Sequence, residues 1–128
     1  LGICVGMQLL ATRGLEHGET PGLNWIAGTV KRLEAPDPTV KVPHMGWNDV
    51  EPMPHAGAAQ LIVPGEAYFL HSYAFHVGHG RDIAAMTDHG GGVVAAVARE
   101  NMLGVQFHPE KSQKYGLALL ERFLEWNP

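Results

Sequence analysis

A single cysteine near the start of the chain has the setting of a catalytic nucleophile. Cys4 lies between Gly2 and Gly6, after an apolar lead-in and before the helix-forming run 7–13. A nucleophile elbow has this form: a residue in a strained turn between a strand and a helix, with small neighbours. The helix N-terminus would favour a thiolate, and the N–H of Val5 would donate to an oxyanion. A lone cysteine in an apolar segment is also often a small buried hydrophobic residue.

A second set of reactive side chains follows an apolar stretch near the other end of the chain. His108 and Glu110 flank Pro109, directly after the predicted strand 103–107. Proline stops the strand and stiffens the turn, so the imidazole is held at a strand end, where sites of α/β proteins form. Thiol, imidazole and carboxylate make a nucleophile, a base and the group that orients the base. Taken alone, the segment is more simply a surface histidine in a turn beside a solvated carboxylate.

The elements that must position these groups are a helix at each end and many strands between them. Alternating and apolar runs predict strands at 28–33, 40–42, 67–75, 83–87, 93–98 and 103–107, the last two as a hairpin. Loops are predicted at 14–22 and 44–48, and a final helix from a cap at Ser112 to about Trp126. This order predicts an α/β domain with a central strand meander.

Composition narrows the class of protein. The 128 residues carry a net charge of -4 and no basic block, which gives nucleic-acid binding little support. No apolar run approaches the length needed to span a membrane. One cysteine makes no internal disulfide, which fits a reducing cytoplasm. The chain starts with Leu1 inside a predicted strand, so we expect residues upstream and interpret 1–128 as the C-terminal part of one domain.

The two reactive segments together resemble the motifs of a known family. Segments 2–8 (Gly-Ile-Cys-Val-Gly-Met-Gln) and 106–110 (Gln-Phe-His-Pro-Glu) resemble the class I (triad) glutamine amidotransferases. Within this family, segments 22–28, 42–48 and 68–73 resemble the glutaminase subunits of imidazole glycerol phosphate synthases, which serve histidine biosynthesis. The resemblance covers essentially the whole chain. It implies a flavodoxin-like α/β domain whose N-terminal part, with the first strands and the oxyanion loop, is missing here.

The resemblance implies roles for the reactive residues. Cys4 attacks the amide carbon of glutamine, which gives a glutamyl thioester and ammonia, and water then releases glutamate. His108 is the general base and then the acid, and Glu110 orients it. Without the oxyanion loop, the 128 residues as they stand are expected to be unstable or inactive. No cofactor or metal is implied.

The same resemblance implies residues that bind the substrate. Gln8 matches a position that helps to hold glutamine; otherwise it is a glutamine on a helix surface. Backbone groups of a short segment would grip the α-amino and α-carboxylate groups of the substrate: His71, Ser72 and Tyr73. Otherwise this segment is an ordinary buried strand end.

A partner is implied as well. It is a cyclase subunit with a (β/α)8 barrel that forms a heterodimer with this protein and receives ammonia through a channel. The face toward the barrel matches a loop made of Met45, Gly46, Trp47 and Asn48. An exposed tryptophan beside methionine and glycine suits an interface hot spot. A tryptophan buried in the domain's own core is the equal alternative.

Three other functions compete with this interpretation. Another class I amidotransferase, for guanylate, anthranilate or carbamoyl phosphate synthesis, would share the elbow and the His-Pro-Glu segment. A metal-binding module would use the neighbouring histidines His71, His76 and His79, but zinc needs four closed ligands, or three and an open position, and no Cys-x-x-Cys lies near. A noncatalytic scaffold would make the triad incidental.

Overall fold

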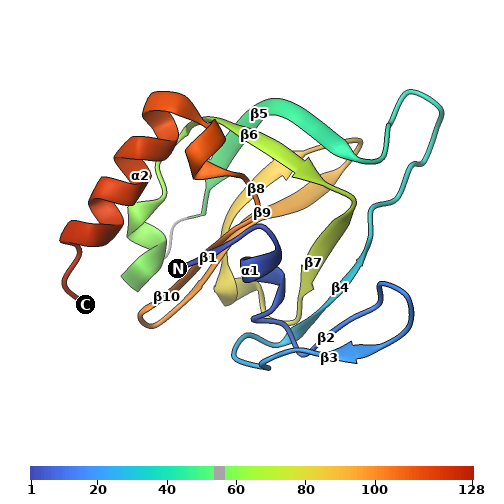
Figure 1. The fold of residues 1–128 in the computed structure, drawn as a ribbon, viewed down its shortest axis with the longest axis horizontal. Helices are drawn as coiled ribbons and strands as arrows, with labels where there is room; N and C mark the ends of the chain where they lie inside the picture. The colour runs from blue at the N-terminus through green and yellow to red at the C-terminus, as the bar shows by residue number, and fades with distance from the viewer. Residues whose placement is uncertain (54–56) are drawn as a thin grey trace.

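Two curled sheets form the framework of the molecule (Figure 1). The computed structural model describes residues 1–53 and 57–128. The six-stranded sheet has the order β1 (Gly2–Ile3), β10 (Met102–Val105), β9 (Gly92–Arg99), β8 (Ile83–Asp88), β5 (His44–Pro52) and β6 (Gly65–His71). The four-stranded sheet has the order β3 (Thr20–Pro21), β2 (Arg13–Gly14), β4 (Gly28–Arg32) and β7 (Tyr73–Val77).

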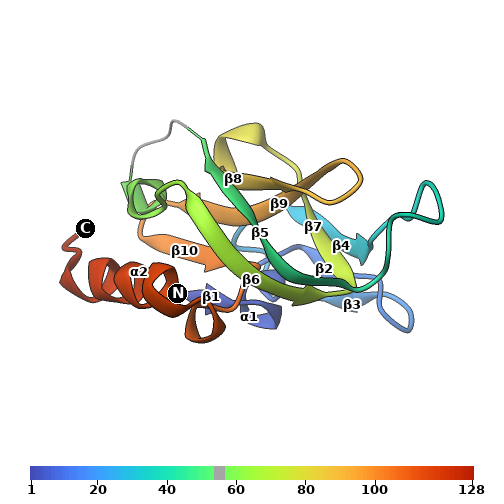
Figure 2. The same ribbon diagram turned by 90° about the horizontal axis from the view of Figure 1, so that it is seen from above.

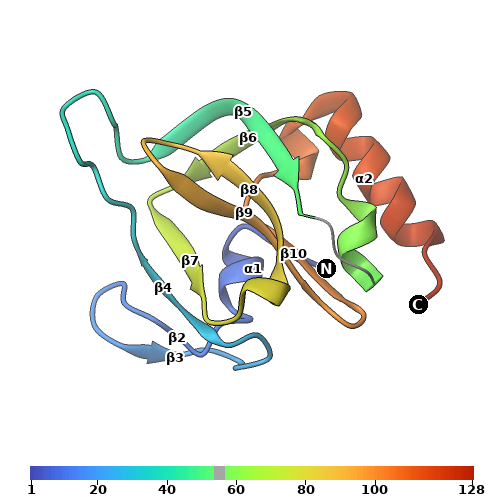
Figure 3. The same cartoon turned by 180° about the vertical axis from the view of Figure 1, so that it is seen from behind.

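Helices are few and short. The α-helices are α1 (Val5–Gln8) and α2 (Gln113–Glu125), and the 3-10 turns are η1 (Gly57–Leu61), η2 (Gly80–Asp82) and η3 (Pro109–Lys111). Figure 2 shows α1 and α2 on the same side of β8, β9 and β10. Figures 1 and 3 show α2 and the β2–β3 pair at opposite ends of the molecule. No helix among the described residues is long and apolar enough to cross a membrane.

The pairing of β1 with β10 brings the two reactive segments of the chain together. The two strands run parallel, with Ile3 beside Val105. The Cys4 N–H continues the ladder by donating to the Val105 carbonyl, at 2.8 Å. Because parallel strands end at the same edge of a sheet, the residues after β1 and after β10 meet there. The predicted hairpin is confirmed: β9 and β10 are antiparallel, with Arg99 opposite Met102.

Helix α2 covers one part of the core and fixes the turn before it. Leu119 is fully buried, and Tyr115 and Phe123 pack on the same cluster as Phe107. Gly116 lies so close to the preceding turn that an added Cβ would be 1.8 Å from the Pro109 carbonyl oxygen. Only glycine permits this approach, so the sequence of α2 determines how near the His-Pro-Glu segment lies.

The predicted helix at 7–13 is wrong beyond its first turn. Helix α1 ends at Gln8, and Arg13–Gly14 belongs to β2. Carbonyls that would continue the helix accept bonds from a distant loop instead: Leu23 N–H donates to Leu9, and Trp25 and Ile26 N–H donate to Leu10. Tertiary hydrogen bonds therefore override a good local helix propensity.

Two further predictions fail around residue 44. Segment 40–42 is not a strand, and the predicted loop 44–48 is the first half of β5. This half of β5 buries His44 and exposes Met45 and Trp47, which is the alternation of a half-covered strand. This half of β5 contains histidine, glycine and asparagine residues, so a prediction from strand propensity missed it. The predicted strand 67–75 breaks at Ser72 into β6 and β7, which belong to different sheets.

Candidate active site

The predicted elbow is present at Cys4. This residue links β1 to α1 with φ 52° and ψ -108°, a region that non-glycine residues rarely adopt. Its carbonyl accepts the N–H groups of Met7 and Gln8, at 3.1 and 3.2 Å. Of the two flanking glycines, only Gly2 is sterically required, since a Cβ there would lie 2.6 Å from the Gly6 carbonyl oxygen. Nothing lies within 4 Å of a Cβ built at Gly6.

The sulfur of Cys4 has donors and an acceptor around it. The Gln106 Nε2 lies 3.5 Å from Sγ, and the Leu70 carbonyl oxygen lies 3.8 Å away. Burial raises the pKa of the Cys4 thiol, and it outweighs the Val5 N–H and the Gln106 amide, which both lower that pKa. The predicted preference for a thiolate is therefore wrong for the resting site. Helix α1 has only four residues, so its dipole is short.

A carboxylate fixes the ring of His108. Its Nδ1 lies 3.0 Å from the Glu110 Oε2. A carboxylate only accepts, so Nδ1 carries the proton of the neutral ring, and Nε2 presents its lone pair. The main chain is held as well, because the His108 N–H donates to the Tyr68 carbonyl at 2.9 Å. The ring therefore has the tautomer that a general base needs.

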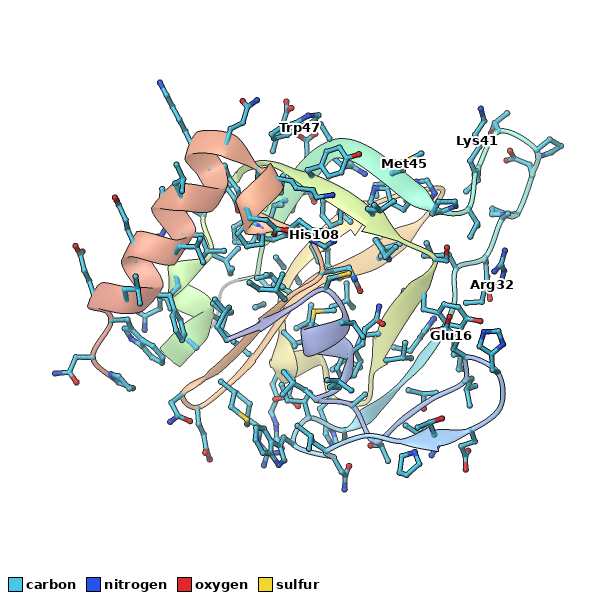
Figure 4. All side chains as sticks on the ribbon, viewed as in Figure 1. Glu16, Arg32, Lys41, Met45, Trp47 and His108 are labelled. Carbon is cyan, nitrogen blue, oxygen red and sulfur yellow. The ribbon has the colours of Figure 1, made fainter. Side chains whose placement is uncertain are left out.

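Ser112 forms hydrogen bonds that hold the turn carrying His108. Its Oγ donates to the His108 carbonyl at 2.7 Å and accepts the Tyr68 N–H at 2.9 Å. The sequence predicted Ser112 as a helix cap, and α2 does begin after it, but its side chain makes no cap bond. In Figure 4, His108 lies near the middle of the molecule, above α1.

The predicted substrate residues line one cavity with the cysteine. A hollow of about 360 Å³ is bounded by Cys4, Val5, Gln8, Glu16, Pro43, Leu70, His71, Ser72 and Tyr73. His108 and Glu110 are not part of this lining and lie at the adjoining end of β10. The sequence analysis missed Glu16 and Pro43. Glu16 was missed because it stands in a loop without a local signal. Figure 4 shows Glu16 at the start of the loop between β2 and β3.

Hydrogen bonds beside the cavity indicate that His44 and His71 are both neutral. The His71 Nδ1 lies 2.8 Å from the Tyr73 carbonyl oxygen, so this nitrogen donates and the His71 Nε2 accepts. The His44 Nδ1, 3.0 Å from that Nε2, is then the donor of the pair. Asn48 Nδ2 lies 3.1 Å from the His44 Nε2 and also donates to the Asp88 carbonyl. The two rings thus bond as uncharged groups.

Burial explains why both histidines stay neutral. It lowers the pKa of His44 to about 3, with the charges of His71 and His89 as smaller causes. It lowers the pKa of His71 to about 4, against the Tyr73 carbonyl, which raises it. His71 is only 6% exposed, so little of it is open to the cavity. His44 was not singled out by the sequence, since its partner His71 lies on a different strand, β6.

The face predicted to meet a partner is exposed. Met45 is 63% exposed and Trp47 is 46% exposed, so Trp47 is not a core residue of this domain. Trp47 meets the Tyr68 ring edge-on, with centroids 6.1 Å apart. Figure 4 shows both residues along the outside of β5. Asn48, in contrast, turns inward to His44.

The histidines in the part of the chain that the structure describes give little support to a metal-binding module. Within residues 1–53 and 57–128, no group of three or more His, Cys, Asp or Glu side chains is placed to hold a metal ion. Both ring nitrogens of His71 are hydrogen-bonded to other partners, Tyr73 and His44. His76 lies on β7 opposite Thr29 and is exposed.

The chain belongs to the class-I glutamine amidotransferases, because the family model described as "Glutamine amidotransferase class-I" matches residues 1–126. The mixed α/β fold is consistent with the predicted flavodoxin-like domain. The chain is similar to "Imidazole glycerol phosphate synthase subunit HisH" of Caulobacter vibrioides, with 58% identity over 129 residues. Proteins of that name from Cereibacter sphaeroides and Zymomonas mobilis are 54% and 58% identical.

These alignments cover all of this chain but only part of each relative. The chain is matched over 100% of its length in all three cases. It spans 61%, 61% and 59% of the lengths of the three relatives, respectively. The family resemblance read from the two reactive segments is confirmed by this match.

Proposed function

We propose that the protein containing this chain is a glutaminase subunit of imidazole glycerol phosphate synthase. It hydrolyses glutamine and passes ammonia to a cyclase subunit, with both subunits in the cytoplasm. The observation that carries the proposal is the strained Cys4 at the edge shared by β1 and β10, where the charge of Glu110, the partner of His108, acts on the thiol. The names of the relatives support the particular synthase. Residues 1–128 form the C-terminal part of its amidotransferase domain.

The chemistry begins with a proton transfer. The pKa of the Cys4 thiol is raised by burial, so the resting group is S–H and a base must remove the proton as the sulfur attacks. His108 Nε2 accepts this proton, and the Nδ1–H bond to Glu110 stabilises the imidazolium. The sulfur adds to the amide carbon of glutamine. His108 then returns the proton to the leaving nitrogen, which departs as ammonia and leaves a glutamyl thioester.

Water completes the cycle. His108 takes a proton from the water that attacks the thioester carbon. The C–S bond then breaks, and His108 returns the proton to the departing sulfur, which gives glutamate and the free Cys4 thiol. The Val5 N–H, which lowers the pKa of the Cys4 thiol in the resting site, is one donor for the oxyanion of both steps. The second donor comes from outside these residues. One such donor is worth roughly two to three orders of magnitude in rate.

The cavity beside Cys4 suits an amino acid. Glu16 is the carboxylate in its lining, and it would bind the α-ammonium group of glutamine. Backbone groups of Ser72 and Tyr73 would bind the α-carboxylate from the break between β6 and β7. Gln8 completes the wall. The γ-amide would then lie toward Cys4.

The cyclase subunit would dock on the exposed side of β5. Met45 and Trp47 project from this strand, and aromatic and methionine side chains are enriched at interface centres. Asn48 joins this strand to His44, whose ring contacts His71 at the wall of the cavity. The strand that carries the partner surface therefore contacts the wall of the glutamine cavity.

Glutamate release tests the proposal. The complete natural protein is assayed alone, with the cyclase subunit, and with the cyclase and its ribonucleotide substrate, and Cys4→Ala is the control. Strong activity only in the third mixture, lost in Cys4→Ala, supports the proposal. Activity that survives Cys4→Ala would overturn the mechanism, and activity that ignores the cyclase and its ligand would overturn the particular synthase.

A further inference from the structure

Gln106 is a buried polar side chain with two specific partners. Its side chain is fully buried, and it follows β10 at the edge where Cys4 lies. Burying an amide costs free energy unless its polar atoms are hydrogen-bonded. Here Oε1 accepts from the Gln8 Nε2 at 3.0 Å, and Nε2 donates to the Cys4 Sγ at 3.5 Å. The backbone N–H is held too, by the Ala95 carbonyl at 2.8 Å.

The direction of the Gln106 amide follows from the Gln8 bonds. The Gln8 side chain meets the Tyr73 carbonyl at 3.0 Å, and a carbonyl only accepts, so the Gln8 atom there is the NH2 group. The same NH2 group faces Gln106, which must therefore present its oxygen to Gln8. The Gln106 NH2 group is then the one that points at the sulfur. No flipped arrangement satisfies all three bonds.

The groups around the sulfur divide by the protonation state they favour. The Leu70 carbonyl accepts from the thiol S–H and favours the neutral form, and the Glu110 charge also disfavours a thiolate. The Gln106 amide and the Val5 N–H favour the thiolate, because bonds to a charged acceptor are the stronger ones. When Val5 serves the oxyanion, Gln106 is the donor that stays on the sulfur.

We propose that Gln106 is a catalytic residue that stabilises the Cys4 thiolate, and that Gln8 positions it. The proposal deepens the proposed glutaminase function, on which it rests. The Gln106 NH2 group would hold the sulfur as its proton moves to His108, and again as the thioester C–S bond breaks and the thiolate leaves. Gln8 then has two roles: it orients the Gln106 amide, and it lines the cavity.

Alkylation of Cys4 by iodoacetamide measures the thiolate without any need for turnover. In the complete natural protein, the rate is followed against pH by mass spectrometry of the Cys4 peptide. Gln106→Met keeps the length of the side chain and removes the donor, and Gln60→Met, at an exposed position of η1, is the matched control. We expect alkylation near pH 7 to slow about ten-fold in Gln106→Met, through a higher thiol pKa, and to stay unchanged in Gln60→Met.

The titratable groups near this sulfur are left unaltered in these variants. The Glu110 charge acts on it from the turn after β10, where Glu110 pairs with His108, and Glu16 and His71 line the cavity beside Cys4. Gln8→Met gives a second test if Gln106→Met does not fold, since it removes the bond that orients the amide while its own site is only half-buried. A slower alkylation in Gln8→Met supports the proposal.

An unchanged pH profile in a folded Gln106→Met or Gln8→Met variant would overturn the proposal. That outcome is independent of the glutaminase assay. A protein without Cys4-dependent glutamate release but with slowed alkylation in Gln106→Met would contradict the proposed function and leave the thiolate contact standing. Slow alkylation with normal release in Gln106→Met would show that the contact does not serve catalysis, which also overturns the proposal.

Discussion

The His44 Nδ1 donates to the His71 Nε2 across 3.0 Å, between β5 and β6. Both rings are nearly inaccessible to solvent, with 4% and 6% exposure. The bond requires His71 to be uncharged, because a proton on its Nε2 would face the proton on His44. The strand that carries Met45 and Trp47 is therefore tied to the cavity wall through two neutral rings.

This pair predicts a loss of stability in acid. The pKa of His44 falls from 6.5 to about 3 on folding, and that of His71 falls from 6.5 to about 4. The unfolded chain then binds more protons than the folded one at intermediate pH. The stabilising contribution is full above about 6.5 and is lost as pH falls toward 4 and 3, with a slope of up to about 1.4 kcal/mol per pH unit for each ring.

Urea unfolding of the complete protein between about pH 7 and pH 4.5 measures that slope. His44→Gln removes one of the two titrating rings, so the pH dependence of the free energy of unfolding should become shallower. His17→Gln is the control, since that side chain is 92% exposed. An equal slope in His44→Gln and in the unaltered protein would contradict the assignment of neutral, buried rings.

Glu110→Gln should move two observables in opposite directions. The carboxylate orients the His108 ring, so its loss should lower kcat about 100-fold with little change in KM. The same carboxylate raises the pKa of the Cys4 thiol, so its loss should speed alkylation of Cys4 at neutral pH. Glu121→Gln, at an exposed position of α2, controls for a lost surface charge. If kcat and alkylation fell together, a general loss of structure would be the better explanation.

Glu16→Gln tests the assignment of the cavity. Removing the charge that faces the α-ammonium group should raise KM for glutamine about ten-fold, with a smaller effect on kcat. Glu19→Gln lies in the same loop and pairs with Arg13 at the surface, so it should leave KM unchanged. Steady-state kinetics of the complete protein with its cyclase gives both values. Equal KM values for the two variants would place the amino acid elsewhere.

The two glycines of the elbow should differ in their tolerance of an added methyl group. An added methyl at Gly2 meets the Gly6 carbonyl oxygen at 2.6 Å, so Gly2→Ala should cost about 1–3 kcal/mol and displace Cys4. At Gly6 the methyl meets nothing, and Gly6→Ala should stay within about 1 kcal/mol of the unaltered protein. Thermal unfolding and glutamate release are measured on both. A tolerated Gly2→Ala would show that the turn is looser than the structure indicates.

The parts of the site that were predictable have local signals. The elbow follows from Gly2, Cys4 and the short helix after them, and the position of His108 follows from a strand stopped by Pro109. These features need only neighbouring residues to be recognised. The late hairpin and α2 were likewise visible from alternation and helical spacing.

The parts that failed depend on distant partners. Helix α1 is cut short by hydrogen bonds from residues 23–26, and β5 exists because β6 supplies its partner. The pKa of Cys4 depends on how deeply the fold buries it, which outweighs the short helix. The role of Gln106 depends on Gln8, which is 98 positions away in the chain. No local pattern carries such information.

The most direct test of the account is to trap the glutamyl thioester. The complete protein with its cyclase and ribonucleotide is mixed with glutamine, quenched in acid within a turnover, and digested for mass spectrometry. The account predicts a glutamyl adduct on the Cys4 peptide, absent in Cys4→Ser and released by mild hydroxylamine. Glutamine turnover without an adduct on Cys4, or with the adduct on another residue, would contradict it.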